Sequence, residues 1–304
     1  MKLILSRKGF DSSAGGCPNP VFPDGRALAL PIPDDQSPIR YSQIQHDGQR
    51  IGPLVSQLTG RSGFSRAGAH LDPDLIEGAY PRLPGWRPVL GQHGSAQAHL
   101  ANHGVGPGDL FLFFALFRQV ERYRRRWRFV PQSRPFHSIW GWLQVGEVWP
   151  VCEAAPVPEW AAYHPHLHGK RSAHNCLYVS GDRLQLPGLV GGLPAAGVVT
   201  VPSDQHRLTA AGAANVTDWR LPAAFMPGAD SEPLSYHHNR ERWRPDESPE
   251  YCRLKCAARG QEFVLNLEQY PGVSEWLRSS GLLAGIYARH SAATAHGIHR
   301  AGAR

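Results

Sequence analysis

Glycine and proline recur along the whole chain, and they constrain its fold more than any other feature of the sequence. The 304 residues include 32 glycines and 27 prolines, which follow no period. Both residue types interrupt helices and strands and favour turns, so the elements between them must be short. A collagen-like chain is excluded because the glycines do not recur at every third position. We therefore predict an α+β fold that is rich in strands and loops.

The composition indicates a folded protein with a basic charge balance. Hydrophobic residues make up 41% of the chain and charged residues 19%, which excludes a wholly disordered protein. The formal net charge is +7. A basic balance favours nucleic acid, a nucleotide or another polyanion as the partner. Arginine-rich coding in a GC-rich bacterial genome would give the same charge, so both interpretations stay open.

The cysteines and the apolar runs bear on the compartment. The chain has five cysteines, an odd number that does not suit a disulfide framework and favours a reducing compartment. The apolar run at residues 3–5 is shorter than the roughly seven residues that a signal peptide needs. No window approaches the roughly 18 apolar residues of a membrane-spanning helix. We expect a cytoplasmic protein without a membrane partner.

The longest apolar run, residues 110–117, predicts a strand that is buried on both faces. A second strand is predicted at 137–148, so that residues 104–148 form a hairpin core around a basic excursion at 118–129. Shorter strands are expected at 2–6, 176–179 and 260–265, and short helices at 95–103 and 274–283, whereas 53–90 is rich in turns. We expect one domain over residues 1–288 and a frayed tail over 289–304.

A loop of polar donors and glycines, residues 7–16, directly follows the first predicted strand. Gly15 and Gly16 allow left-handed backbone and a close approach to a ligand, so the loop could cradle a phosphate. Asp11 could bind a base edge or act as a general base. The loop lacks the Gly-Lys-Ser/Thr ending of a Walker motif, and an ordinary connection is the alternative. A serine hydrolase is disfavoured because the chain has no Gly-x-Ser-x-Gly elbow.

Metal-ligating side chains alternate in two segments, HLDPD at 70–74 and HPHLH at 164–168. Pro73 and Pro165 favour extended backbone, on which alternate side chains share one face. Imidazoles and carboxylates in such an arrangement can bind zinc or iron. Because the chain has 16 histidines, coincidental spacing is the alternative.

The hairpin core resembles the core of small PUA-like barrels, including the EVE and ASCH types. The residues that carry the resemblance are GDLFLFFALF at 108–117 and IWGWLQVGEV at 139–148. The resemblance implies that a base is gripped between strands and aromatic side chains. Trp140 and Trp142 offer stacking faces, and the arginines at 122–128 could meet phosphates. The alternative is a hairpin whose tryptophans only fill the core.

Several blocks together resemble one family, the nucleotide modification associated domain 3 (Nmad3) family. They are LSRKGFDSSAGGCPNPVFPDGR at 5–26, SPIRY at 37–41, HLDPDL at 70–75, GVGPGDLFLFFALFR at 104–118, HSIWGWLQVGEV at 137–148 and GQEFV at 260–264. The resemblance implies a part in a system that modifies bases in nucleic acid. It brings no assigned catalytic residues, so the candidates below come from the residues themselves.

The leading hypothesis is a protein that acts on or recognises a base or nucleotide in a modification system, with a divalent metal, iron or zinc, as a candidate cofactor. The alternatives are a metal-dependent oxygenase or hydrolase of small-molecule metabolism and a non-catalytic reader of modified bases. All require the 7–16 loop to meet the HLDPD segment in one pocket. The catalytic candidates are Asp11, Asp72 and His99; the ligand- or phosphate-binding candidates are Ser6, Arg7, Lys8, Ser12, Ser13, Arg40, Trp140 and Trp142; the metal candidates are His70, Asp74, His164 and His166.

Overall fold

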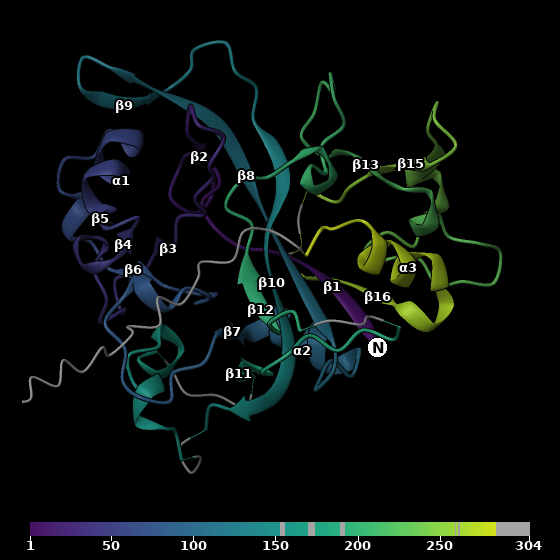
Figure 1. Ribbon diagram of the computed structural model, residues 1–304, viewed down its shortest axis with the longest axis horizontal. Coiled ribbons are helices and arrows are strands. Elements are labelled where there is room, and N and C mark those ends of the chain that lie inside the picture. Colours follow the sequence, from purple (N-terminus) through teal and green to yellow (C-terminus); the bar gives the residue numbers. More distant parts are fainter. Residues whose placement is uncertain (153–155, 170–173, 189–191, 259, 261, 284–304) are drawn as a thin grey trace, which may run out of the picture.

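A nine-stranded sheet forms the centre of the molecule (Figure 1). The computed structural model describes residues 1–152, 156–169, 174–188, 192–258, 260 and 262–283. The strands of the main sheet are β1 (Lys2–Arg7), β2 (Asn19–Val21), β7 (Val89–His93), β8 (Leu110–Tyr123), β9 (Arg126–Phe129), β10 (Phe136–Pro150), β11 (Asn175–Ser180), β12 (Ala196–Val198) and β16 (Glu262–Asn266). Their order is β16-β1-β8-β10-β11-β7, while β2 and β9 pair with β8 and β12 pairs with β10.

The central strand β8 follows directly from the apolar run in the sequence. Of its first eight residues, all but Leu116 are buried. Phe111 and Phe113 pack into one hydrophobic cluster, and Leu112 and Phe114 pack into another on the opposite face. Strand β10 runs back antiparallel along β8. The doubly buried strand and its hairpin with β10 are therefore confirmed.

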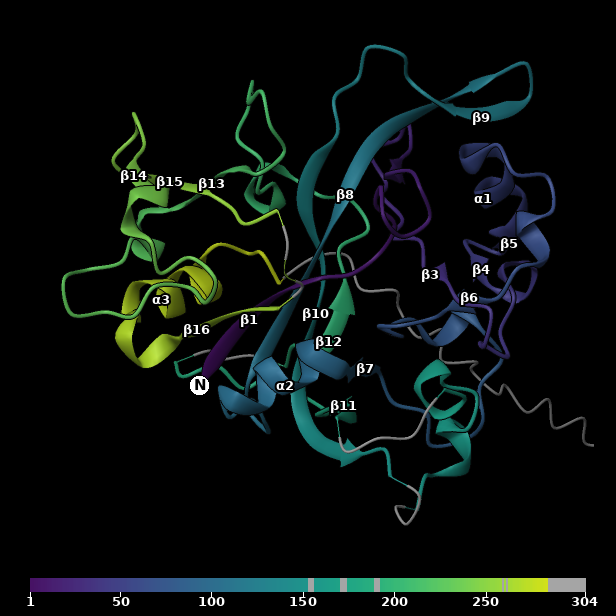
Figure 2. The ribbon, with the colours of Figure 1, turned by 180° about the vertical axis from the view of Figure 1, so that it is seen from behind.

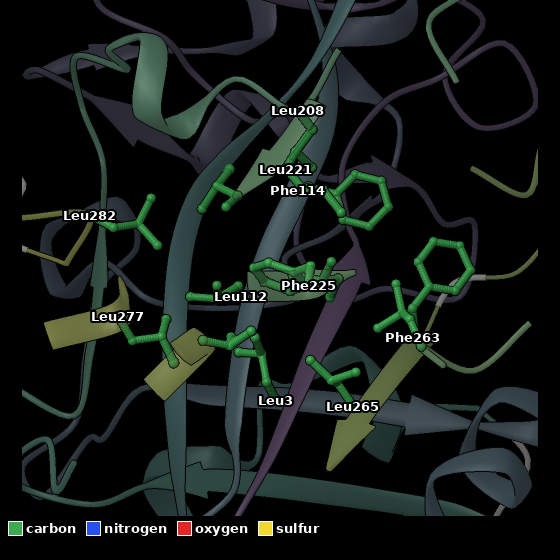
Figure 3. Packing of buried hydrophobic residues seen from close by; sticks show 14 of the residues in the cluster. Leu3, Leu112, Phe114, Leu208, Leu221, Phe225, Phe263, Leu265, Leu277 and Leu282 are labelled. Carbon is green, nitrogen blue, oxygen red and sulfur yellow. The ribbon is translucent and has the colours of Figure 1, made fainter. Parts of the chain in front are cut away.

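Strand β1 lies between β8 and β16, parallel to the first and antiparallel to the second. Figure 3 shows Leu3 of β1, Leu112 of β8 and Leu265 of β16 in the same core. The register places Ser6 opposite Glu262 of β16. Because β1 ends at Arg7, opposite Phe114, the following loop begins partway along the longer strand β8.

Smaller elements cover the two sides of the sheet (Figure 2). The strands β13, β15 and β14 form a three-stranded sheet on the same side as α3, whereas α1 and the β3–β6 ladder lie on the other side. The elements are β3 (Ile32–Pro33), β4 (Gln45–His46), β5 (Gln49–Arg50), α1 (Gly52–Thr59), β6 (Ala69–His70), α2 (Gly94–Asn102), β13 (Asp218–Pro222), β14 (Trp243–Pro245), β15 (Tyr251–Lys255) and α3 (Pro271–Ser279).

The fold is mixed α+β and rich in strands, as predicted. Its sheets are open within the described residues, and the main sheet ends at β16 and at β7. A PUA-like core requires a closed barrel, so that finer comparison is not confirmed. Among the described helices, none is both long and apolar enough to cross a membrane.

Most of the predicted elements are present, and the differences are local. Helix α2 and strands β1, β11 and β16 lie where the sequence predicted them, and α3 begins three residues earlier than expected. The turn-rich description of residues 53–90 was wrong at its start, because α1 begins at Gly52 with a proline at its first turn. The segment 118–129, predicted as a basic excursion between two strands, consists of the end of β8 paired with β9. The predicted tail at 289–304 lies outside the described residues.

His137 is a buried histidine that makes the fold sensitive to acid. Its Nδ1 accepts a hydrogen bond from Nε1 of Trp219 at 3.0 Å, so this nitrogen carries no proton. Burial, with a smaller contribution from Arg7, lowers the pKa of His137 to about 3. In the unfolded chain the imidazole returns to an ordinary pKa near 6.5. Below that pH the unfolded state binds a proton that the folded state does not, so stability is lost as the pH falls.

We expect this one residue to lower the free energy of unfolding by about 1.5 kcal/mol between pH 6.5 and pH 5. In His137→Gln the fall over this interval should be smaller by that amount, whatever the absolute stability of the variant. Urea unfolding at several pH values measures both slopes. Equal slopes for the two proteins would contradict the assignment.

Candidate metal centre

A cavity of about 590 Å³ opens where the chain leaves β1. Five segments that are distant in the sequence form its walls: the loop after β1, the β3–β6 ladder, the end of β7, the 165–169 turn and the start of β11. The lining residues are Arg7, Lys8, Gly9, Asp11, Ser13, Ala14, Ile32, Pro33, Asp34, Gln36, His70, Asp72, Gly91, Gln92, His93, Pro165, His166, Gly169 and Asn175. The loop after β1 and the HLDPD segment thus meet in one cavity.

Two imidazoles and one carboxylate converge in this cavity. His70, Asp72 and His166 each offer one ligand atom, and these atoms lie within 4.8 Å of one another. Nε2 of His70 and Nε2 of His166 lie 3.9 and 3.8 Å from Oδ2 of Asp72. Two histidines and one carboxylate with room for further ligands form a donor set typical of iron(II) and, in other proteins, of catalytic zinc.

Hydrogen bonds on the far side of each imidazole hold the rings in place. Nδ1 of His70 lies 2.8 Å from Oδ2 of Asp34, and Nδ1 of His166 lies 2.8 Å from Oδ1 of Asn175. The Asn175 amide also donates from Nδ2 to the carbonyl oxygen of His166, so its Oδ1 must accept from Nδ1. With Nδ1 occupied in this way, Nε2 of each ring is the nitrogen directed at the Asp72 carboxylate. Metal-binding histidines are usually oriented in this way.

The protonation states also suit a metal. Burial lowers the pKa of His166 to about 3, although the charge of Asp72 opposes the shift. Burial would raise the pKa of Asp72, but His164, His166 and Lys8 outweigh it and hold that pKa below its ordinary value. The Asp72 carboxylate also accepts the backbone N–H of Gly91 at 2.5 Å. At neutral pH the centre therefore presents a carboxylate and an unprotonated imidazole, which are the forms that bind metals.

His164 lies beside this group in a fully buried position. Its Nε2 is 3.3 Å from Oδ1 of Asp72, but neither ring nitrogen makes a hydrogen bond of ordinary geometry to a described residue. Buried imidazoles without partners are costly. His164 is therefore close enough to support Asp72, while the three-residue group does not include it.

A largely covered lysine, Lys8, lies on another wall of the cavity. Nζ of Lys8 lies 3.3 Å from Oε1 of Glu262, and the two side chains are 10% and 1% exposed. Gln92 donates to the same carboxylate. Burial raises the pKa of Glu262, and Lys8 opposes this. Lys8 also helps to lower the pKa of Asp72, so its charge acts on the histidine–carboxylate group.

The other candidates in and before the first loop differ in whether they face the cavity. Arg7 lines the cavity, and its guanidinium donates to the carbonyl oxygens of residues 257 and 258. Oδ1 of Asp11 accepts from the backbone of Ser13 and Ala14 and from the Ser13 hydroxyl, so this carboxylate organises the turn. Ser12 is exposed, and Ser6 is buried within β1.

Several predicted site residues lie away from the cavity. Asp74 is buried in an ion pair with Arg82, and Tyr163 donates to its other oxygen. His99 lies on α2, where its Nε2 is 3.0 Å from the Ser235 hydroxyl. The Arg40 guanidinium donates to the carbonyl oxygen of residue 66. The structure does not bring these three candidates to the histidine–carboxylate group.

The two tryptophans occupy different surroundings. Trp142 is fully buried in the core, and its Nε1 donates to the carbonyl oxygen of Pro194. Trp140 is partly buried, donates to the carbonyl oxygen of Lys8 and lines a separate, mostly apolar cavity of about 50 Å³. Neither indole lines the larger cavity.

The 164–168 segment is not extended as predicted. Pro165–Leu167 forms one turn of 3-10 helix, which directs His166 into the cavity and leaves His168 bonded to the carbonyl oxygen of Ala162. The residues that support the centre, among them Asp34, Asn175 and Glu262, were not predicted from the sequence. The one available signal was a polar residue at the edge of an apolar strand, as at Asn175 in NCLYVS and Glu262 in EFVLN.

Gly91 is required by the packing of the centre. A Cβ atom at this position would lie 2.3–2.6 Å from three ring atoms of His166. We expect Gly91→Ala to displace the imidazole, to destabilise the fold by roughly 1–3 kcal/mol through overpacking, and to weaken metal binding. The matched control is Gly78→Ala, where a Cβ meets nothing within 4 Å. Thermal unfolding and metal titration of both variants test this, and similar behaviour of the two would contradict it.

Comparison with known proteins gives one finding. The sequence model of nucleotide modification associated domain 3 (Nmad3) matches residues 2–266. This range includes all the residues described above as lining the cavity. No curated protein and no solved structure matches the chain.

Proposed function

The chain belongs to the nucleotide modification associated domain 3 (Nmad3) family, and from this membership and the geometry of the cavity we propose that it is a metal-dependent enzyme of a nucleotide modification system. Its substrate would be a base or nucleotide that enters the cavity. The observation that carries the proposal is the convergence of His70, Asp72 and His166 on one point of an open cavity. We also propose that residues 1–288 act as a single domain.

The donor set favours iron(II) or zinc over magnesium or calcium. Magnesium and calcium prefer oxygen ligands, whereas two imidazoles suit first-row transition metals. A metal held on one side by these three residues would keep open coordination positions toward the cavity. When bound there, such a metal could polarise a substrate or activate water or oxygen.

The protein residues would bind and orient the substrate. Lys8 and Arg7 put positive charge on the wall that leads to the centre, which suits a phosphate or another anionic group. Asp34 and Asn175 would keep the two imidazoles oriented. A volume of about 590 Å³ falls within the range usual for small-molecule sites and would accept a nucleotide. Asp11 and Ser13 would shape the entrance through the turn that they form.

Metal content tests the proposal directly. We expect the purified protein to bind one equivalent of iron(II) or zinc, and His166→Ala and Asp72→Asn to lose it. His168→Ala is the matched control, because this neighbouring histidine is bonded to the carbonyl oxygen of Ala162. Elemental analysis and calorimetric titration under anaerobic conditions give the stoichiometry. Absence of binding in the unaltered protein, or equal binding in all variants, would refute the metal centre.

The Lys8–Glu262 pair predicts a separate effect on stability. Lys8→Met leaves a buried carboxylate without its cation, and breaking a buried pair in this way costs about 3–5 kcal/mol. The double variant Lys8→Met/Glu262→Gln should recover most of that loss, since both charges are removed. Urea unfolding measures the two differences. A single variant as stable as the unaltered protein would show that the pair is not coupled.

The same double variant tests substrate binding without the fold defect. A hydrogen bond to a charged group contributes about 1.5–3 kcal/mol, so we expect nucleoside monophosphate affinity to fall roughly tenfold to a hundredfold. Affinity for the corresponding nucleoside should change little. Lys255→Gln, on the exposed end of β15, is the control. A non-catalytic reader would bind the same ligands and leave them chemically unchanged, which product analysis distinguishes.

A further inference from the structure

The twelve residues 118–129, here called the basic arm, concentrate the positive charge of the protein. They contain six arginines and one glutamate, a net charge of +5 in a chain whose net charge is +7. Figures 1 and 2 show this β8–β9 hairpin extending beyond the rest of the sheet. Arginine-rich coding alone would spread the charge along the chain. Its concentration on one projecting hairpin therefore requires a different explanation.

The turn of the arm is not optimised for folding. Arg124 and Arg125 occupy its two central positions, between the paired residues Tyr123 and Arg126. Both have left-handed backbone, with φ of 48° and 66°. Asn-Gly is preferred in such a turn, and a residue with a longer side chain costs roughly 1–2 kcal/mol per position. Two exposed arginines are kept where the fold favours smaller residues, which points to a function for their side chains.

Aromatic rings hold several of the guanidinium groups. Arg122 lies over the Trp127 ring, with its Cζ 4.4 Å from the centroid, and Arg128 lies over Tyr123 at 3.7 Å. Such stacking orients the guanidinium plane and lowers the entropy lost on binding. Among the described residues, the one ion pair of the arm is internal and joins Arg128 to Glu121. Most of the positive charge of the arm is thus left for a partner.

Helix α1 connects the arm to the cavity. The backbone N–H of Trp127 donates to the side chain of Gln57 on α1 at 2.7 Å. Arg61 follows the end of α1 by two residues. One of its guanidinium nitrogens lies 3.9 Å from the point where a Cβ atom would stand if Gly16 had a side chain. Gly16 belongs to the loop whose Asp11 and Ser13 line the cavity. Helix α1 thus contacts the arm through Gln57, and Arg61 after its end places a positive charge beside the loop at the cavity.

We propose that the basic arm binds the phosphate backbone of a polynucleotide and presents one of its bases to the cavity. This rests on the proposed function and narrows the substrate from a free nucleotide to a base within a nucleic acid strand. An anionic membrane is less suited to the arm. Two aromatic residues of the arm, Trp127 and Phe129, are partly buried against the core around α1, and the third, Tyr123, is exposed but carries the Arg124 and Arg128 guanidinium groups over its ring.

The test removes charge from the arm while improving its turn. Arg124→Asn/Arg125→Gly replaces two arginines by the residues that this turn prefers, so the variant should fold at least as well as the unaltered protein. The matched control is Arg244→Gln/Lys255→Gln, which removes two exposed charges from the three-stranded sheet on the other side of the molecule. Binding of short labelled oligonucleotides, single-stranded and double-stranded, is measured as a function of salt concentration.

For the arm variant we expect the slope of log affinity against log salt to fall by about 1.8 on duplex, or about 1.4 on single strands. At 0.1 M salt the affinity should fall on the order of tenfold or more. The control variant should retain both values. The form of nucleic acid that loses more affinity identifies the form the arm prefers.

Equal binding by the arm variant and the unaltered protein would overturn the proposal, as would an equal loss in the control. Tighter binding of polyglutamate or of phosphatidylserine vesicles than of either oligonucleotide at the same salt would also overturn it. Metal content and mononucleotide affinity are measured on the same variants. If these are intact while the arm makes no difference, the polynucleotide inference fails alone; if metal binding is absent while the arm still binds oligonucleotides, the proposed enzyme function fails alone.

Discussion

The buried carboxylate of Asp72 is the interaction on which the centre depends. Moving an unpaired carboxylate out of water costs several kcal/mol, and a fold can bear this only by supplying donors and positive charge around it. Here the backbone N–H of Gly91 donates directly, three imidazoles surround the group, and Lys8 acts from the adjacent wall. The donors come from separate segments, so the carboxylate ties the β3–β6 ladder to β7 and to the 164–168 turn.

The main sheet makes this convergence possible. Strand β1 is flanked by β16 and β8 and ends at Arg7, so the polar loop begins beside strands of the hydrophobic core. Strands β7 and β11 pair with each other at the other end of the sheet, with Asn175 opposite His93. The cavity lies where these strand ends meet the covering ladder. A rigid sheet thus holds ligand-bearing segments that have little regular structure of their own.

Local sequence patterns predicted the sheet better than they predicted the centre. The apolar run of β8 and its partner β10 were identified because doubly buried strands have a distinctive composition. Helix α1 was missed because residues 53–90 were described as rich in turns, although the proline at 53 also suits the first turn of a helix. The loop and the HLDPD segment were expected to meet, but Asp34 and Asn175 could not be chosen as ring partners, since their proximity arises from pairing between distant segments. Trp142 was assigned to stacking because a side chain that fills the core and one that lines a site look alike in sequence.

The arrangement of polar groups also argues against a purely structural centre. Asp72, His164, Lys8 and Glu262 are all nearly buried near one another, and His164 has two ring nitrogens without hydrogen bonds to described residues. Replacing buried charged groups by apolar residues of similar size is often neutral or stabilising, so stability alone gives little reason to keep them. Proteins keep such costly groups mainly where a function requires them. The turn at the tip of the basic arm is also costly, because Arg124 and Arg125 have left-handed backbone there. The buried polar residues of the centre and the arginines of the turn both lower the stability of the fold. The first are suited to binding a metal, and the second are suited to binding an anionic ligand.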